Sequence, residues 1–501
     1  MDLNIQFLYI KWSRDMTIPW HYRFRIDERT EKTIFLKLTN QIISEILNGR
    51  LKKGTKLPGT RNLATELKIN RKTVQLVYED LEAQGWLNSK PRQGTFVSDY
   101  FPDLNSKENK KLRKTVNPPP KDSVIDQKIV PMEAFDDGFP DASLVPYELF
   151  SRSYRHALIK ITRDNLIGYS DPQGNLSLRD EIAKMLSMER FINTSSDQIC
   201  IVRGSQMGIF VSSRILAKLV PSSKLILAIE ELMYPPALEA FQSNNYEIVT
   251  IKLDQDGLDT IYLEKILSKQ KITAVYTTPH HQYPTTVTMP MERRLKLLEL
   301  SKKFGFYIIE DDYDHEFHYD SRPLPPLASL PNSENVIHIG SLSKVFAPGI
   351  RLGYIVGRSE IIQNIIKDIL LIDRQGNIIN ELAIAELLHL GEIKRHIRKM
   401  RKIYHLRLDF TISEFHQIFG HQVTIIPPLG GMAIWVRFNF ELTEKMRIGI
   451  HQLGFYVDDY FSYIENNPIN FFHIRFGFAS LKEEGIQKTI SKLKTVLTQE
   501  M

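Results

Sequence analysis

Apolar residues near the start of the chain recur at helical spacing. Between Thr33 and Leu47 they return every three or four positions, which predicts an amphipathic helix that ends at Asn48-Gly49. A second, shorter helix is predicted over residues 61–67, with Thr60 as its N-cap. The pattern therefore indicates two helices joined by a short connection.

A third helix and a β-hairpin follow. The third helix has one apolar face, formed by Val74, Val77, Tyr78 and Leu81. Two short strands, at residues 86–87 and 95–97, then flank a polar tip at residues 92–94. Helix, short helix, turn, helix and hairpin is the element order of a winged helix-turn-helix, a small α+β fold.

The pattern changes beyond about residue 132, where short apolar segments alternate with longer amphipathic ones. The clearest predicted strands are Lys224–Ile229, Thr273–Thr277, Phe306–Ile309 and Val336–Ile339. This alternation predicts an α/β domain with a largely parallel sheet. The length that remains leaves room for a smaller C-terminal subdomain.

The chain is thus predicted to be multidomain. We expect a winged helix domain over residues 19–99, a linker over residues 100–131 and the α/β domain over residues 132–501. The linker contains the charged run 107–114 and the stiff segment Pro118-Pro119-Pro120, with few apolar residues to form a core.

Composition excludes several classes of protein. Of the 501 residues, 42% are hydrophobic and 25% are charged, which is ordinary for a globular protein and argues against a wholly disordered or coiled-coil chain. No apolar run is long enough to span a membrane. The single cysteine, Cys200, favours a reducing, cytoplasmic compartment. The short apolar run at residues 7–10 lacks the features of a signal peptide, and either Met1 or Met16 can be the start.

Charge is concentrated in the N-terminal region. Residues 50–92 contain ten Lys or Arg and four Asp or Glu, a net charge of +6 that equals the formal charge of the whole chain. Such a segment indicates a polyanionic partner, although a solvated basic surface is the simpler alternative.

The positions of these cations favour DNA. The second helix of a helix-turn-helix enters the major groove, where Arg and Gln contact base edges while Lys and Thr suit phosphates. The candidate DNA-binding residues are Arg61, Arg71, Lys72, Thr73 and Gln75 on the helices, with Arg92 and Gly94 on the hairpin tip. The alternative is polar decoration of a small helical domain.

At this point the residues resemble a known family. The region from Gly49 to Val97 is similar to the GntR-type winged helix domain. It departs from that family at Gly59, where Ser is common. The resemblance implies binding to a double-stranded DNA operator.

A second group of motifs lies in the α/β domain. The segment GSLSKVFAPGIRLGY (residues 340–354) follows a predicted strand, and its Lys344 can form a Schiff base with an aldehyde. Arg351, seven residues further on, can return to a phosphate. Taken alone, a lysine in such a setting is more often a surface residue.

Three further segments strengthen this interpretation. EDDYDHEF (residues 310–317) follows a buried strand, where an Asp can pair with a pyridinium nitrogen. An acidic loop or a metal site formed by Asp311, Asp312, Asp314 and His315 is the alternative. RGSQMGIF (residues 203–210) opens a helix whose N–H groups suit a phosphate, and TTPHHQYPTT (residues 277–286) follows another strand.

Together, from about residue 135 onward, these segments resemble a fold-type I pyridoxal-phosphate domain of the aspartate-aminotransferase type. The resemblance implies pyridoxal 5'-phosphate as cofactor and no metal. It makes Lys344 the catalytic, Schiff-base lysine, pairs Asp311 with the pyridine nitrogen, and places Tyr313 near the ring hydroxyl and Tyr234 on the ring. The phosphate would be surrounded by Ser205, Gln206, Ser341, Ser343 and Arg351, and Arg475 would bind an effector carboxylate.

The whole chain, in this order, resembles the MocR/GabR subfamily of GntR-type regulators. The resemblance implies a small amino compound as effector and a head-to-tail homodimer. Three positions depart from relatives of this kind: Pro236 stands in place of an arginine, Thr278 in place of asparagine and Thr286 in place of glycine.

Three functions remain open at the level of sequence. The first is a transcriptional regulator that senses pyridoxal phosphate or an amino compound. The second is a working aminotransferase with an accessory DNA-binding domain. The third is a domain of this fold that binds no cofactor. The basic winged helix favours the first, because an enzyme does not need it.

Overall fold

The computed structural model describes residues 34–99, 138–166, 168–220, 224–319, 322–346, 348–455 and 471–498. The chain divides into two compact units, residues 1–129 and 130–501, and each is considered by itself. The predicted linker, the start of the predicted winged helix domain and the two candidate start positions lie outside the described residues.

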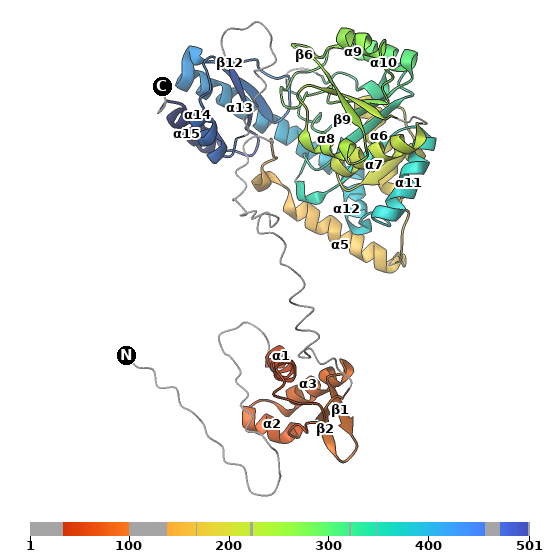
Figure 1. Ribbon diagram of the computed structural model, residues 1–501, viewed down its shortest axis with the longest axis vertical. Coiled ribbons are helices and arrows are strands. Elements are labelled where there is room, and N and C mark those ends of the chain that lie inside the picture. The colour runs from red at the N-terminus through yellow and green to blue at the C-terminus, as the bar shows by residue number, and fades with distance from the viewer. Residues whose placement is uncertain are drawn as a thin grey trace. The chain divides into compact units, whose positions relative to one another are not determined.

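The N-terminal unit is a winged helix-turn-helix. Its elements are α1 (Ile34–Leu47), α2 (Thr60–Leu67), α3 (Arg71–Ala83), β1 (Leu87–Lys90) and β2 (Gly94–Val97) (Figure 1). The two strands pair antiparallel, with Leu87 opposite Val97. Apolar residues of all three helices form one buried core, in which Leu38, Leu63 and Val74 are fully buried. The predicted order of elements is confirmed.

The start of α2 corrects one detail of the prediction. The N-cap of α2 is Gly59 and not Thr60, which is the first helical residue. Gly59 takes an extended backbone and provides no side-chain cap. The hydroxyl of Tyr78 instead donates a 2.9 Å hydrogen bond to the carbonyl of Pro58, which ties the start of α2 to α3. The side chain of Asn70 caps α3 by accepting from the N–H of Lys72 at 2.8 Å.

The C-terminal unit is built on a seven-stranded sheet with the order β3-β11-β10-β9-β8-β4-β5. β11 runs antiparallel to both of its neighbours, and the other neighbouring strands are parallel. The strands are β3 (Ile199–Val202), β4 (Ile226–Glu230), β5 (Glu247–Ile251), β8 (Ala274–Thr277), β9 (Tyr307–Asp312), β10 (Val336–Ser341) and β11 (Gly353–Val356). All four predicted strands are present, and the expected α/β fold is confirmed.

Helices cover both faces of this sheet (Figure 1). On one face lie α7 (Ser205–Leu219), α8 (Pro235–Gln242) and α11 (Ser359–Ile372), whose apolar residues share a buried cluster with the strands. On the other lie α9 (Thr260–Leu267) and α10 (Met291–Phe304). A further cluster at the β3 and β11 edge includes residues of α5 (Tyr147–Arg163), α6 (Leu176–Arg190) and α12 (Ile378–His389). A small hairpin, β6 (Leu253–Asp254) with β7 (Gly257–Leu258), follows β5.

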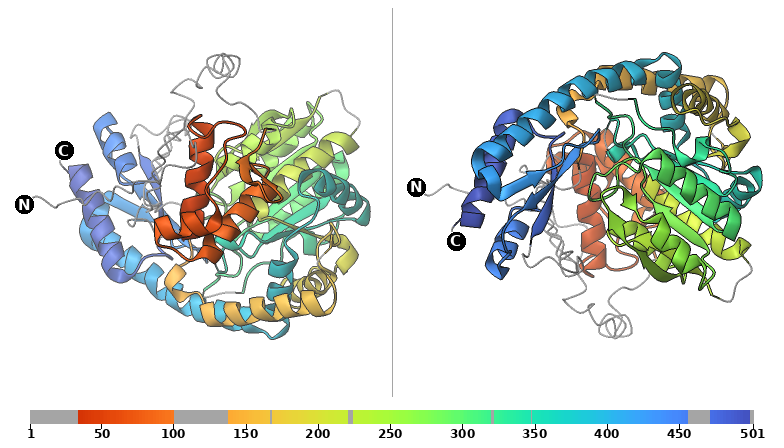
Figure 2. Two further views of the ribbon diagram at one scale, coloured as in Figure 1. Left: turned by 90° about the horizontal axis from the view of Figure 1, so that it is seen from below. Right: turned by 90° about the horizontal axis from the view of Figure 1, so that it is seen from above.

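A smaller antiparallel sheet forms the C-terminal part of this unit. Its strands are β12 (Val423–Ile425), β13 (Ala433–Phe438) and β14 (Phe472–Gly477), and its helices are α13 (Glu392–Phe419), α14 (Glu444–Gln452) and α15 (Glu483–Thr498). The long helix α13 passes from the large sheet to this smaller one (Figure 2). In the part of the chain that the structure describes, no helix combines the length and apolar character needed to cross a bilayer.

Candidate cofactor site and nucleic-acid interface

A cavity lies at the carboxyl ends of the parallel strands. β4, β8, β9 and β10 run in the same direction, so the residues that follow them meet at one edge of the sheet. The cavity is lined by Ser205, Tyr234, Thr278, Tyr283, Asp311, Tyr313, Lys344 and Arg475. Six of these are residues that the sequence predicted, and Thr278 and Tyr283 are the additions. The four other predicted residues, Gln206, Ser341, Ser343 and Arg351, do not line it.

Asp311 is buried at the end of β9, beside a tyrosine of the neighbouring strand. The hydroxyl of Tyr276 donates a 2.8 Å hydrogen bond to Oδ2 of Asp311. Burial raises the pKa of Asp311 to about 7, although this hydrogen bond opposes the rise. A cation near Oδ1 would favour the charged carboxylate, which is the property required of a partner for a pyridinium nitrogen.

The start of α7 and Arg351 form a place suited to an anion. α7 begins after Gly204, which has a φ of 80° and provides no side-chain cap. A Cβ at Gly204 would lie 3.0 Å from the guanidinium of Arg351, so only glycine leaves this approach open. Arg351 donates to the carbonyl of Arg203 at 2.9 Å. A helix N-terminus beside a guanidinium is a typical phosphate site.

Ser341, Ser343 and Gln206 are the other residues predicted to bind the phosphate. Ser341 ends β10, and its hydroxyl accepts a 3.2 Å hydrogen bond from the N–H of Ser343. Gln206, in the first turn of α7, donates to the carbonyl of Pro236 at 2.7 Å. Gln206 therefore connects α7 to the start of α8, directly after Tyr234.

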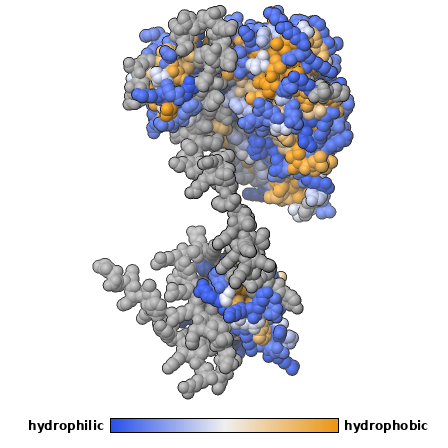
Figure 3. Space-filling view, viewed as in Figure 1, coloured by the Kyte–Doolittle hydropathy of each residue, from blue (hydrophilic) through white to orange (hydrophobic). Residues whose placement is uncertain are grey.

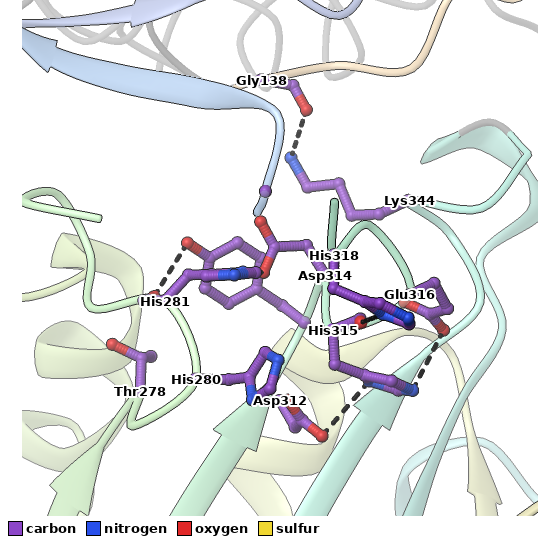
Figure 4. A network of polar contacts seen from close by, with 12 residues as sticks. Gly138, Thr278, His280, His281, Asp312, Asp314, His315, Glu316, His318 and Lys344 are labelled. Carbon is purple, nitrogen blue, oxygen red and sulfur yellow. Dashed lines mark hydrogen bonds and ion pairs between the residues drawn. The ribbon is translucent and has the colours of Figure 1, made fainter. Parts of the chain in front are cut away.

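Lys344 follows β10 and reaches toward the segment after the linker. Its Nζ lies 3.5 Å from the carbonyl oxygen of Gly138 (Figure 4) and 4.9 Å from the centre of the Phe139 ring. That segment is fixed a few residues later, where Asp141 pairs with Arg407 at 2.8 Å. The amine of Lys344 is therefore held between the cavity and the beginning of the described C-terminal unit.

Arg475 enters the cavity from β14 of the smaller sheet. It is buried, it donates to the carbonyl of Pro284 at 2.9 Å, and its guanidinium lies 4.8 Å from the centre of the Tyr283 ring. The hydroxyl of Tyr313, 3.5 Å from Nη2 of Arg475, donates to the carbonyl of His281 at 3.1 Å. A planar guanidinium held by such contacts is suited to a carboxylate.

The acidic cluster that suggested a metal site is divided among separate partners. Asp312 pairs with Arg190 at 2.5 Å and with His315 at 3.2 Å, while Asp314 lies 2.6 Å from Nδ1 of His281 (Figure 4). Although burial opposes it, the Arg190 guanidinium holds the pKa of Asp312 well below its usual range. No group of side chains among the described residues has the arrangement of a metal site.

The loop after β8 carries two of the departures noted in the sequence. Thr286 has a φ of 64°, a left-handed conformation that glycine adopts freely and a β-branched residue does not. The hydroxyl of Thr278 accepts a 3.0 Å hydrogen bond from the N–H of Tyr283 within the same loop. The loop is anchored by Gln282, which donates to the buried carboxyl group of Glu230 at 3.2 Å.

The donor set around the cavity fits pyridoxal phosphate. Oδ1 of Asp311, Oε1 of Gln206 and Oγ of Ser343 are buried, and none has a hydrogen-bond partner among the described residues. All three belong to residues predicted to hold the cofactor. Burying polar atoms without partners is costly, and pyridoxal phosphate could satisfy two of them, with a protonated ring nitrogen that donates to Asp311 and a phosphate that accepts from Ser343.

The predicted DNA-binding residues lie on the outside of the winged helix. Arg61, Arg71, Lys72, Gln75, Arg92 and Gly94 are exposed, and Thr73 is half-buried. The amide of Gln75 donates a 2.9 Å hydrogen bond to Glu79 on the same helix. On the hairpin, Arg92 and Gly94 both have positive φ angles, 62° and 112°, which form the tight tip between the strands.

The sequence did not single out several residues that the structure brings to the site. Tyr276 lies inside a predicted strand, where its side chain was indistinguishable from a core residue. Tyr283 lies in the segment TTPHHQYPTT. The signal that could have identified it is an aromatic residue in a loop that follows a strand end. Gly138 and Phe139 follow the linker and carried no signal of their own.

Comparison with known proteins agrees with this geometry. Residues 150–493 match the family model "Aminotransferase class I and II", and residues 36–97 match "Bacterial regulatory proteins, gntR family". The helix-turn-helix transcriptional regulator YhdI of Bacillus subtilis is 29% identical over 473 residues, which cover 94% of this chain and 97% of that protein.

Two further comparisons extend the match. The probable rhizopine catabolism regulatory protein MocR of Rhizobium meliloti is 28% identical, over 84% of this chain and 85% of that protein. Kynurenine aminotransferase of Pyrococcus horikoshii superposes with a TM-score of 0.64 at 26% identity, over 80% of this chain and 98% of that one. The chain therefore belongs to the class I and II aminotransferase family and, with its GntR-type winged helix, is a pyridoxal-phosphate-dependent, DNA-binding transcriptional regulator of the MocR/GabR type.

Proposed function

We propose that this regulator responds to a small amino acid bound between Lys344 and Arg475. The observation that carries the proposal is that both residues line one cavity. An amino acid has an amine for the cofactor end and a carboxylate for Arg475. Lys344 and Arg475 are the cationic residues among the described residues that line this cavity, so we expect an effector with a single carboxylate.

The residues around the cavity would hold the cofactor from several sides. When bound, pyridoxal phosphate supplies an aldehyde that condenses with amines and a ring that stabilises negative charge. We assign its covalent attachment to Lys344, its ring nitrogen to Asp311, its ring hydroxyl to Tyr313 and one ring face to Tyr234. We assign its phosphate to Ser205, Gln206, Ser341, Ser343, Arg351 and the start of α7.

Coupling to DNA needs contacts that differ between two states of the protein. Lys344 has contacts that a ligand could replace, because its amine lies 3.5 Å from the carbonyl oxygen of Gly138 and faces the ring of Phe139. These residues open the described part of the C-terminal unit, directly after the segment that leads from the winged helix. We propose that engagement of the Lys344 amine by a ligand changes these contacts and so alters DNA binding.

For the winged helix we propose that α3 enters the major groove. Arg71 and Gln75 would then contact base edges, and Lys72 and Thr73 would contact phosphates or flanking groups. Arg61, at the start of α2, would face the backbone. Arg92 and Gly94, at the hairpin tip, would approach a phosphate or the minor groove.

We also propose that two chains form a head-to-tail homodimer. α5 exposes the apolar side chains of Leu158 and Ile159, and apolar surface is visible over the α5 region of the C-terminal unit (Figure 3). Exposed apolar patches of this kind are typical of protein interfaces. Light scattering should give twice the mass of the chain, and the double substitution Leu158→Lys with Ile159→Lys should lower it.

The regulatory proposal is tested by measuring DNA affinity with and without ligands. Fluorescence anisotropy on DNA from upstream of the protein's own gene, with the cofactor-loaded full chain, should show a shift of roughly tenfold with one member of an amino acid panel. Lys344→Ala should still bind DNA but lose this response. Arg71→Ala should lose specific binding and keep the cofactor.

Two results would contradict the proposal. One is DNA affinity that no amino acid changes, while the cofactor binds normally. The other is steady release of a 2-oxo acid product at about 1 s⁻¹ or faster, which is an ordinary enzymatic rate and would favour a working aminotransferase.

A further inference from the structure

The outer face of α3 carries a large apolar side chain, Leu76, that the DNA-binding motif does not explain. Leu76 is 47% exposed. Among the described residues of the N-terminal unit, the other exposed large apolar side chains are Ile34 and Leu36, both in the first turn of α1. Among the described residues of α2, α3 and the hairpin, Leu76 is therefore the single large apolar side chain on the exposed surface.

Helix geometry places Leu76 on the side opposite the core. The buried residues of α3 are Val74, Val77, Tyr78 and Leu81. At 100° per residue, positions 72, 76 and 79 form a stripe on the far side of the helix from these four. Leu76 thus lies one turn after Lys72, in the same exposed stripe.

The turn of α3 before Leu76 is polar and carries a cation. Lys72 and Thr73 lie one turn before Leu76, and Glu79 and Asp80 lie one turn after it. Gln75, the preceding residue, is exposed and donates a 2.9 Å hydrogen bond to Glu79. Helical side chains lean toward the N-terminus, so Leu76 covers the turn that begins at Lys72. This is the half of α3 that would enter the groove. The cations of α3, Arg71 and Lys72, are at this end of the helix and suit a polyanion, while its acids, Glu79 and Asp80, lie toward the other end.

The major groove offers an apolar side chain few partners. Base edges there present hydrogen-bond donors and acceptors, and the apolar group among them is the 5-methyl of thymine. We infer that Leu76 is a specificity-determining residue, which packs against a thymine methyl group in each half-site. The inference rests on the proposed placement of α3 in the major groove and adds the identity of a base that it reads.

The test removes the methyl group without changing any hydrogen bond. Duplexes are first selected from a random-sequence library with the cofactor-loaded full chain, and each thymine is then replaced in turn by deoxyuridine. We expect one position per half-site at which uracil weakens wild-type binding roughly fourfold, as for one buried methyl group. At that position, 5-methylcytosine should bind more tightly than cytosine.

Variants assign the effect to Leu76. Leu76→Ala should bind the thymine duplex more weakly than wild type and show no further loss with uracil at the sensitive position. Leu76→Met, which keeps an apolar contact, should retain sensitivity to uracil. Circular dichroism and thermal unfolding show whether each variant is folded, and the uracil scan on the wild type does not depend on any variant.

Several outcomes overturn the inference. They are the absence of any uracil-sensitive thymine, equal sensitivity to uracil in Leu76→Ala and wild type, or a Leu76→Ala affinity equal to that of wild type. Equal loss of affinity on every duplex would show that Leu76 acts through protein packing. If α3 does not enter the major groove at all, Arg71→Ala should keep specific binding, and this result distinguishes that case from an error about Leu76 alone.

Discussion

Tyr276 and Asp311 form a buried pair beneath the candidate cofactor cavity. They lie on the adjacent parallel strands β8 and β9, and the Tyr276 hydroxyl donates to Oδ2 of Asp311 at 2.8 Å. Oδ1 of the same carboxyl group is buried without a hydrogen-bond partner among the described residues. One oxygen is therefore fixed by the protein, and the other remains to accept a hydrogen bond from a ligand.

Substitution of Tyr276 by Phe should weaken cofactor binding about tenfold, the usual effect of losing a hydrogen bond to a charged group. The Tyr276 hydrogen bond lowers the pKa of Asp311, so its loss raises that pKa further and leaves less carboxylate at neutral pH. Titration of the apoprotein with pyridoxal phosphate from about pH 6 to pH 9 should show the affinity profile moved to higher pH.

Tyr246→Phe is the matched control for this substitution. Tyr246 is also a buried tyrosine of the same core cluster, and its hydroxyl donates to the carbonyl of Ser213 at 3.0 Å. We expect its loss to affect stability and to leave the pH profile of cofactor binding in place. Equal profiles for the two variants would mean that Tyr276 does not act through Asp311.

Asp311→Asn should stabilise the cofactor-free protein, and more so at high pH. The pKa of Asp311 is about 7 in the folded protein, above its ordinary value near 4, so ionisation favours unfolding. The contribution of Asp311 to the free energy of unfolding is fully present below about pH 4 and is lost as the pH rises through 7. The total loss is on the order of 4 kcal/mol. Urea unfolding at about pH 5 and pH 8 measures the difference.

Bound cofactor should oppose this stabilisation of Asp311→Asn. Asparagine cannot provide the negative charge that a pyridinium nitrogen requires, so the loaded Asp311→Asn protein should gain less stability from pyridoxal phosphate than wild type. Glu334→Gln, a change of an exposed carboxylate in the turn before β10, serves as a control and should change stability little at either pH. A stability gain in Asp311→Asn that is the same at both pH values would refute the explanation.

Arg475→Lys should lower the affinity for the amino acid effector by at least tenfold while cofactor binding is kept. Lysine lacks the planar fork that binds a carboxylate through two parallel hydrogen bonds, and it loses the contact with the Tyr283 ring. Calorimetry with cofactor-loaded protein provides the measurement. Arg437→Lys, a change on the neighbouring strand β13, should bind the effector like wild type, and an equal loss in both would argue against a carboxylate contact.

Thr286→Gly should raise the stability of the C-terminal unit by about 1 kcal/mol. Thr286 has a φ of 64°, which strains a β-branched residue and not glycine. Thermal unfolding of the cofactor-free protein should detect the increase. Thr285→Gly is the opposite case, because it removes the 2.5 Å hydrogen bond from Thr285 to Gln282, and it should destabilise. A lower melting temperature for both variants would mean that the strain at Thr286 is relieved by other contacts.

Local features of the chain were predictable because they depend on neighbouring residues. The apolar stripe of Val74 and Val77 predicted α3, and the position of Lys344 just after an apolar segment placed it at a strand end. The prediction of Thr60 as the N-cap was wrong, and here a contact from outside the segment is involved. Gly59 takes the extended backbone of the N-cap position, and the preceding turn is fixed by Tyr78 from another helix.

By itself, the sequence determined the two kinds of domain, the exposed cations of the winged helix and most of the residues that surround the cavity, since periodicity and short motifs are properties of consecutive residues. Only the tertiary structure decided which side chains meet. Tyr276 reaches Asp311 from 35 residues away because β8 and β9 are neighbours in the sheet, and Arg475 reaches Tyr313 from 162 residues away because the smaller sheet packs beside the larger one. Strand order and packing depend on the burial of apolar surface across the whole unit, which no single stretch of sequence specifies.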